Sequence, residues 1–114
     1  MPGKARSKYG NKKTVTGGLT FDSGRESCRW SQLVLMEKAG EISGLERQIT
    51  FELIPKQRLK NGKCERSLKY ILDFRYTDKN GVVIHDDSKG KRTADYVIKR
   101  KLMLYVHGIE ILET

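Results

Sequence analysis

Two aspartates and a lysine are spaced along the chain in a way that suits metal-assisted chemistry. Apolar side chains alternate from Leu68 to Tyr76, which places Asp73 on the opposite face of the predicted strand. Asp87 belongs to the next predicted strand, and Lys89 comes two positions later. Two carboxylates, together with a strand carbonyl and water, can bind a hard cation such as Mg²⁺ or Mn²⁺. These residues are therefore the first candidates for a catalytic site.

The turn between these two strands decides whether the aspartates meet. A two-residue loop would put the apolar residues of the two strands on different faces. A three-residue loop, with Gly81 in the left-handed conformation, keeps one apolar face and sets Ile84 opposite Tyr76. This register also sets Asp73 directly opposite Asp87, where like charges destabilise a strand pair.

The opposed carboxylates predict a positive charge between them. A divalent cation would neutralise both, and Lys89 would neutralise them in part. The alternative is that Asp73 and Asp87 belong to a solvated charged face that also contains Lys69, Arg75 and Lys89. The spacing alone leaves both interpretations open.

Glu26 is a third candidate carboxylate. With Ser23 it forms a Ser-x-x-Glu capping box, which by itself explains both residues at the start of a helix. A site role for Glu26 requires that this end of the helix face Asp73 and Asp87. Asp86 is a competing carboxylate, but it falls on the core face and has the wrong spacing to Lys89, so Asp87 is preferred.

Elements of both kinds must hold these residues in place. The hydrophobic periodicity and the turn residues predict a short extended segment at residues 14–21 and a helix at 24–39. They then predict a meander of three strands, at 45–54, at 68–77 and from residue 82. A second helix at 93–105 and a closing strand at 109–112 complete the predicted order. This order predicts an α+β fold with a mixed central sheet. The apolar stripe of the second helix is expected at Ala94, Val97, Ile98, Leu102 and Tyr105. Residues 14–114 are expected to form a single domain, and residues 1–13 a disordered basic arm.

The overall charge indicates a polyanionic partner. The chain has 114 residues, with 23 Lys and Arg against 14 Asp and Glu, a formal net charge of +9. Such an excess favours nucleic acid over a neutral metabolite. No apolar run is long enough for a membrane-spanning helix and no secretory signal is readable, so a cytoplasmic protein without a membrane partner is expected.

The cysteines indicate neither a disulfide scaffold nor a zinc ribbon. Cys28 and Cys64 lie far apart without a Cys-x-x-Cys spacing, and free thiols are the expected state. A zinc site that combines both with His85 and His107 is a minor alternative, because no two of these residues have the close spacing usual in structural zinc sites.

Three segments together resemble the PD-(D/E)XK nuclease superfamily. They are FDSGRE at residues 21–26, YILDF at 70–74 and DSKG at 87–90. The greatest similarity is to a family of small phage and prophage proteins of unknown function, related to archaeal-type Holliday junction resolvases. It extends from Lys8 to the C-terminus, although Leu72 replaces the proline of the motif and Ser88 an often apolar residue.

The resemblance implies a restriction-endonuclease-like core of helix, three-strand meander, helix and strand. It also implies Mg²⁺- or Mn²⁺-dependent hydrolysis of DNA phosphodiester bonds, without a nucleotide cofactor. Asp73, Asp87 and Lys89 would match the three motif residues, and Glu26 the helix glutamate used by many members. Metal ligands would be Asp73, Asp87, Glu26 and the carbonyl of Ser88.

The basic residues around these segments are the expected DNA contacts. They lie in the loop after the first long strand, after the candidate catalytic strand and in the second helix: Arg58, Lys60, Lys63, Lys91, Arg92, Lys99, Arg100 and Lys101. No base-reading motif is present, which favours selection of DNA by structure, as with a four-way junction. A four-way junction has two-fold symmetry, and a domain this small would need a partner subunit to cut two strands symmetrically. A homodimer is therefore expected.

Two other functions remain open at this stage. A phage accessory protein could keep the fold and bind DNA without cutting it, in which case Asp73→Asn would be tolerated. A phage structural or host-interaction protein would show little dependence on salt toward DNA.

Overall fold

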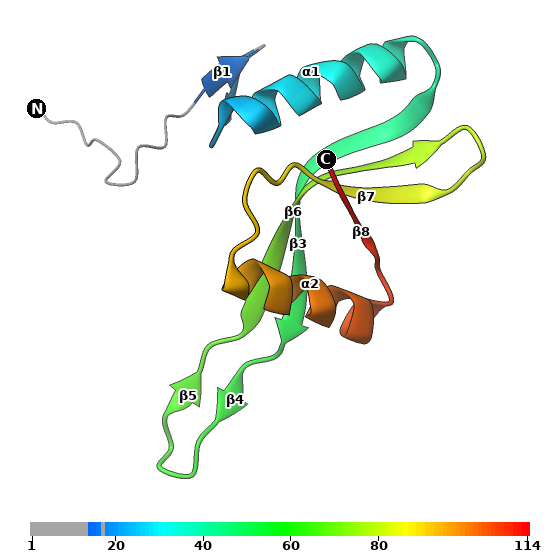
Figure 1. Cartoon of the computed structure of the whole chain (residues 1–114). Helices are drawn as coiled ribbons and strands as arrows, with labels where there is room; N and C mark the ends of the chain where they lie inside the picture. The colour runs from blue at the N-terminus through cyan, green and yellow to red at the C-terminus, as the bar shows by residue number, and fades with distance from the viewer. Residues whose placement is uncertain (1–13, 17) are drawn as a thin grey trace, which may run out of the picture.

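The computed structural model describes residues 14–16 and 18–114, and the predicted arm at 1–13 lies outside them. The described elements, in chain order (Figure 1), are β1 (Thr14–Thr16), β2 (Leu19–Phe21), α1 (Gly24–Lys38), β3 (Ile42–Ile54), β4 (Gln57–Arg58), β5 (Cys64–Glu65), β6 (Leu68–Asp78), β7 (Val83–Asp87), α2 (Ala94–His107) and β8 (Ile111–Glu113). Neither helix in this part of the chain is long and apolar enough to cross a membrane.

A mixed four-stranded sheet forms the centre of the fold, in the order β3-β6-β7-β8. The β3–β6 and β6–β7 pairs are antiparallel, whereas β7 and β8 are parallel. Parallel neighbours need a crossover connection, and α2 provides it between β7 and β8. The predicted α+β class with a mixed central sheet is confirmed.

The turn between β6 and β7 has the predicted three-residue register. Ile84 lies opposite Tyr76, and the backbone N–H of Asp78 donates to the carbonyl of Val82 at 2.9 Å. Gly81 has a φ of 82°, a conformation that glycine adopts without steric cost. The apolar alternation of the two strands has therefore specified their pairing correctly.

The first helix begins and ends where the sequence predicts. Ser23 caps α1 by accepting a hydrogen bond from the N–H of Glu26 at 3.2 Å. After the helix, Gly40 adopts a φ of 80° and the chain turns into β3. This strand begins at Ile42, earlier than predicted, since the polar residues before Leu45 carry no alternation.

The second helix has its predicted position, and its predicted apolar stripe is correct in part, because Val97 and Leu102 pack against the hydrophobic core. Thr93 caps α2, yet the side chains that it buries are Tyr96 and Met103. Ile98 and Tyr105 are 57% and 87% exposed. The error arises because Tyr96 and Met103 shift the buried face of the helix away from the stripe that Ile98 and Tyr105 suggest.

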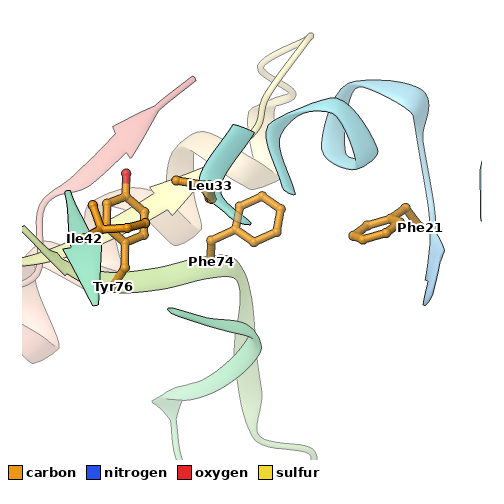
Figure 2. Packing of buried hydrophobic residues seen from close by; sticks show 5 residues of the cluster. All are labelled: Phe21, Leu33, Ile42, Phe74 and Tyr76. Carbon is orange, nitrogen blue, oxygen red and sulfur yellow. The ribbon is translucent and has the colours of Figure 1, made fainter. Parts of the chain in front are cut away.

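Two hydrophobic cores lie along the sheet. The first, against α1, contains Phe21, Leu33, Ile42, Phe74 and Tyr76 (Figure 2). The second, against α2, contains Leu53, Tyr70, Leu72, Tyr96 and Met103.

Along both long strands, β3 and β6, the side chains change from packing on the first core to packing on the second at neighbouring positions. On β6, Leu72 belongs to the second core and Phe74 to the first, so the change falls at Asp73. On β3, Leu45 packs on the first core and Ile49 on the second. Asp73 therefore lies at the junction between the part of the sheet packed on α1 and the part packed on α2.

A small hairpin extends from the far end of β3 and β6. Strands β4 and β5 pair with each other and point away from the body of the molecule (Figure 1). The basic loop predicted after β3 is the tip of this hairpin, where Gly62 has a φ of 88°.

Candidate active site

The two aspartates predicted to face each other lie side by side on neighbouring strands. The last β6–β7 pair is Phe74 with Asp86, and the next position on each strand is Asp73 and Asp87. Their carboxyl groups are within hydrogen-bonding reach of each other. Asp73 also accepts a hydrogen bond from the backbone N–H of Ser88 at 3.0 Å.

The environment of Asp73 favours its protonated form. Burial, followed by the adjacent carboxyl of Asp87 and the charge of Glu26, raises the pKa of Asp73 to about 8. The N–H of Ser88 opposes this shift. Without a cation, the pair therefore holds a proton near neutral pH, and a bound cation would have to replace it.

Asp87 is buried and only partly satisfied. Its Oδ2 accepts a hydrogen bond from the hydroxyl of Tyr70 and lies 3.9 Å from Nζ of Lys89. Its Oδ1 is buried and has no hydrogen-bond partner among the described residues. A buried carboxylate oxygen without a partner is costly, and it is the kind of atom that a hard cation satisfies.

Glu26 faces this pair from the first turn of α1. It is buried, and its charge acts on Asp73. Its Oε2 accepts a hydrogen bond from Nε2 of Gln48 at 3.3 Å and lies 3.9 Å from Nη2 of Arg47. Burial raises the pKa of Glu26, and the hydrogen bond from Gln48 opposes the rise. Glu26 thus lies close enough for its charge to act on Asp73, beside its place in the helix cap.

The neighbouring Asp86 has a structural role. It is 0% exposed, and both of its oxygens are satisfied. Oδ2 accepts from Arg29 at 2.8 Å and from the hydroxyl of Tyr76 at 2.7 Å, and Oδ1 accepts from the hydroxyl of Thr114 at 2.8 Å. Asp86 is therefore fully used in joining α1 to the sheet, which leaves Asp87 as the ligand candidate.

Backbone contacts with the end of the chain hold the segment that carries Lys89. The N–H of Thr114 donates to the carbonyl of Asp87 at 3.0 Å, and the N–H of Lys89 donates to the carbonyl of Thr114 at 3.1 Å. The Lys89 ammonium lies 4.7 Å above the ring centre of Tyr96. Tyr96 and Asp87 thus hold the Lys89 ammonium beside the carboxylate pair.

The predicted DNA contacts fall into three groups, which differ in whether their charges are already paired within the fold. Arg58, Lys60 and Lys63 are exposed on the β4–β5 hairpin. Lys91 and Arg92 lie between β7 and α2, and Lys99, Arg100 and Lys101 lie on α2. Arg92 and Arg100 bind Glu113 at 2.6 and 2.9 Å, and they hold its pKa at about 2. These two arginines are thus already paired with a carboxylate within the fold.

Two hollows flank the carboxylate pair. One, of about 300 Å³, contains three lysines and is lined by Lys69, Tyr70, Ile71, Lys89, Thr93, Asp95, Tyr96 and Lys99. The other, of about 390 Å³, lies at the start of α1 and is lined by Gly24, Arg25, Cys28, Arg29, Gln32, Ser88 and Thr114. Asp73 and Asp87 line neither hollow, but each hollow contains residues that contact the pair, because Tyr70 and Lys89 contact Asp87 and Ser88 contacts Asp73.

Sequence reasoning misses several residues of this region. The alternation of β6 predicts Tyr70 only in the core and Lys69 only on a charged face. Arg25 lies in the segment FDSGRE without an assigned role, and Gln48 belongs to no motif. A signal exists for Tyr70, since a buried tyrosine hydroxyl needs a hydrogen-bond partner, but for Gln48 only the folded backbone identifies the position.

The described residues contain no ready-made cluster of metal-binding side chains. Among residues 14–16 and 18–114, no group of three or more His, Cys, Asp and Glu side chains is arranged to hold a metal ion. The alternative zinc site is therefore wrong: Cys28 and Cys64 are exposed free thiols. A cation at the aspartate pair would need Asp73, Asp87 and backbone or water oxygens as ligands, with Glu26 nearby.

Comparison with known proteins identifies a family. No curated protein and no solved structure matches the chain. A protein family described as "Protein of unknown function (DUF1064)" matches residues 6–109, which include the aspartate pair, Lys89 and Glu26. The chain therefore belongs to the DUF1064 family.

Proposed function

We propose that this chain is a Mg²⁺- or Mn²⁺-dependent endodeoxyribonuclease of the PD-(D/E)XK type, with a restriction-endonuclease-like core. The single observation that carries the proposal is the pair of adjacent carboxyls at Asp87, which is buried, and Asp73, which is half-buried. Such a pair is destabilising unless something neutralises it, and carboxyls with perturbed pKa values concentrate at catalytic sites. The order α1, β3, β6, β7, α2, β8 agrees with the core that the sequence resemblance implies.

Each residue of the candidate site would have a distinct role in the hydrolysis of the phosphodiester bond. Asp73, Asp87 and the carbonyl of Ser88 would hold the cation, whose chemistry when bound is to polarise a phosphate oxygen and acidify a water molecule. Lys89, two residues after Asp87, would donate to a non-bridging phosphate oxygen and stabilise the charge that develops there. Glu26 would orient the attacking water and accept its proton.

The distribution of positive charge supports DNA as the substrate. Lysines line one hollow beside the pair and Arg25 the other, so a phosphate backbone could cross the site between them. The β4–β5 hairpin, which carries Arg58, Lys60 and Lys63, points away from the body of the molecule (Figure 1). Because the sequence contains no base-reading motif, we propose branched DNA such as a Holliday junction as the substrate, bound by a homodimer.

The function is tested by incubating the full chain with labelled four-way junction, flap, duplex and single-stranded DNA. Cleavage is expected with Mg²⁺ or Mn²⁺ and none with EDTA, with the junction or flap cut fastest. Cleavage that continues in EDTA would overturn the metal-dependent mechanism. Binding to every substrate without cutting would overturn the enzyme and favour the accessory protein.

A salt titration tests the proposed DNA surface. Replacing Arg58, Lys60 and Lys63 together with glutamine is expected to lower the slope of log affinity against log salt by about 0.9 for each phosphate that these side chains neutralise. Lys38→Gln with Lys79→Gln is the matched control, because these exposed lysines lie near the start of β3, at the opposite end from the hairpin. Equal slopes for the hairpin variant and the wild type would show that the hairpin does not bind phosphate.

One observation favours a non-catalytic DNA-binding protein as the second candidate. Tyr70 and Lys89 already contact Asp87, and the proton held by Asp73 removes a charge. The pair can thus exist without a metal ion. The cleavage assay above distinguishes the two candidates.

A further inference from the structure

Gln48 has an unusual backbone conformation at the position of β3 that lies opposite Asp73. It lies on β3 between Arg47, which pairs with Phe74, and Ile49, which pairs with Leu72. The position between them is opposite Asp73. With a φ of 59°, Gln48 is the only non-glycine residue with a positive φ in the part of the chain that the structure describes.

This conformation is unfavourable for any residue that has a Cβ atom. The same strand uses glycine when it needs such a φ, since Gly44 has a φ of 64°. At position 48 the chain instead keeps a long amide side chain. Strained non-glycine residues persist where the surrounding structure holds them in place, and they concentrate at active sites.

The Gln48 side chain contacts the candidate site directly. Its Nε2 donates to Oε2 of Glu26, and Glu26 is the carboxylate whose charge acts on Asp73. An amide satisfies a buried carboxylate oxygen without adding charge, unlike Arg47, whose nearest nitrogen lies 3.9 Å away from the same atom. Gln48 therefore connects the strand position opposite Asp73 with the carboxylate that faces it from α1.

We propose that Gln48 is a positioning residue for the cleavage reaction, whose left-handed backbone directs its amide to Glu26 and fixes that carboxylate toward Asp73. The inference rests on the proposed nuclease function and extends it. A residue that orients a reacting group through one hydrogen bond typically changes the reaction by about 10- to 100-fold when it is removed.

A purely structural role is the competing explanation. The chain passes from the first core to the second at this level, and a left-handed residue could serve only to bend β3 there. Glycine separates the two roles, because Gln48→Gly keeps the backbone conformation and removes only the amide. Under the structural explanation this variant should be fully active.

The experiment compares the wild type, Gln48→Gly and Thr50→Gly, all as the full chain. Thr50 is exposed on the same strand and serves as the matched control for a glycine in β3. We measure the melting temperature, the single-turnover cleavage rate at saturating DNA, and its dependence on Mn²⁺ concentration. Gln48→Asn, which keeps an amide on a shorter side chain and tolerates a positive φ, is the second variant.

Gln48→Gly is expected to melt at or above the wild-type temperature and to cleave about 10- to 100-fold more slowly, with unchanged DNA affinity. Thr50→Gly should melt lower and cleave normally, and Gln48→Asn should be intermediate in rate. Wild-type cleavage by Gln48→Gly would overturn the inference and leave the nuclease intact. A melting temperature below that of Thr50→Gly would also overturn it, because it would show that the Gln48 amide mainly stabilises the fold. A wild-type chain that cuts no DNA would overturn the proposed function together with this inference.

Discussion

Asp87→Asn is expected to lower the single-turnover cleavage rate by about 10³-fold or more while DNA binding stays within a few-fold of wild type. The substitution keeps the shape of the side chain and the partners Tyr70 and Lys89, but it removes the negative charge that would hold the cation. Reductions of this size are typical when a charged catalytic group is neutralised. DNA affinity should persist because the proposed phosphate-binding surface consists of other residues.

The same change one residue earlier provides the control. Asp86→Asn should lower the melting temperature instead, because Asp86 forms a buried ion pair with Arg29 at 2.8 Å. Breaking such a pair costs about 3–5 kcal/mol. Cleavage per folded molecule, measured well below the melting temperature, should remain. An Asp87→Asn protein that cuts DNA at the wild-type rate would place the active site elsewhere.

Asp73→Asn is expected to make the metal-free protein more stable. Burial in the folded state, followed by Asp87 and the charge of Glu26, raises the pKa of Asp73 to about 8 from an unfolded value of 3.8. The folded state then binds this proton more tightly than the unfolded state, and the contribution of Asp73 to stability falls as pH rises from about 4 to about 8. The asparagine variant does not show this decrease.

Thermal unfolding between about pH 5 and pH 8.5 in EDTA measures this effect. Removing directly opposed like charges raises the free energy of unfolding by up to about 1 kcal/mol. For a small domain, a gain of about 1 kcal/mol corresponds to a rise in melting temperature of roughly 4 °C or more. The difference between variant and wild type should widen toward high pH. Millimolar Mn²⁺ should raise the melting temperature of the wild type and leave that of Asp73→Asn unchanged. A variant that melts below wild type across this range would show that the carboxylate stabilises the fold.

The fold was accessible from sequence where local patterns agree with tertiary packing. The alternation from Leu68 to Tyr76 and the glycine at position 81 together specify the β6–β7 register, and Ser23 specifies the start of α1. The buried face of α2 was predicted only in part, because Val97 and Leu102 pack against the core but Ile98 and Tyr105 are exposed. A helix with apolar residues on several sides does not reveal its buried face without its neighbours.

The candidate site was accessible only in part. The predicted register places Asp73 beside Asp87 because cross-strand position follows from the turn. Gln48 could not be found in this way, because neither its φ nor its contact with Glu26 follows from residue type or spacing. The pairing of Arg92 and Arg100 with Glu113 was likewise invisible, since β8 reaches them only in the folded chain.

The central claim is that the Asp73–Asp87 pair is a site for a divalent cation. Direct Mn²⁺ binding, followed by electron paramagnetic resonance or calorimetry, tests it without interference from contaminating nucleases. Glu46→Gln is the control, since this exposed carboxylate binds Arg75 away from the pair. We expect the wild type and Glu46→Gln to bind about one Mn²⁺ per chain and Asp87→Asn to bind none at the same concentration. A wild-type chain that binds no Mn²⁺, or an Asp87→Asn chain that binds it equally well, would contradict the claim.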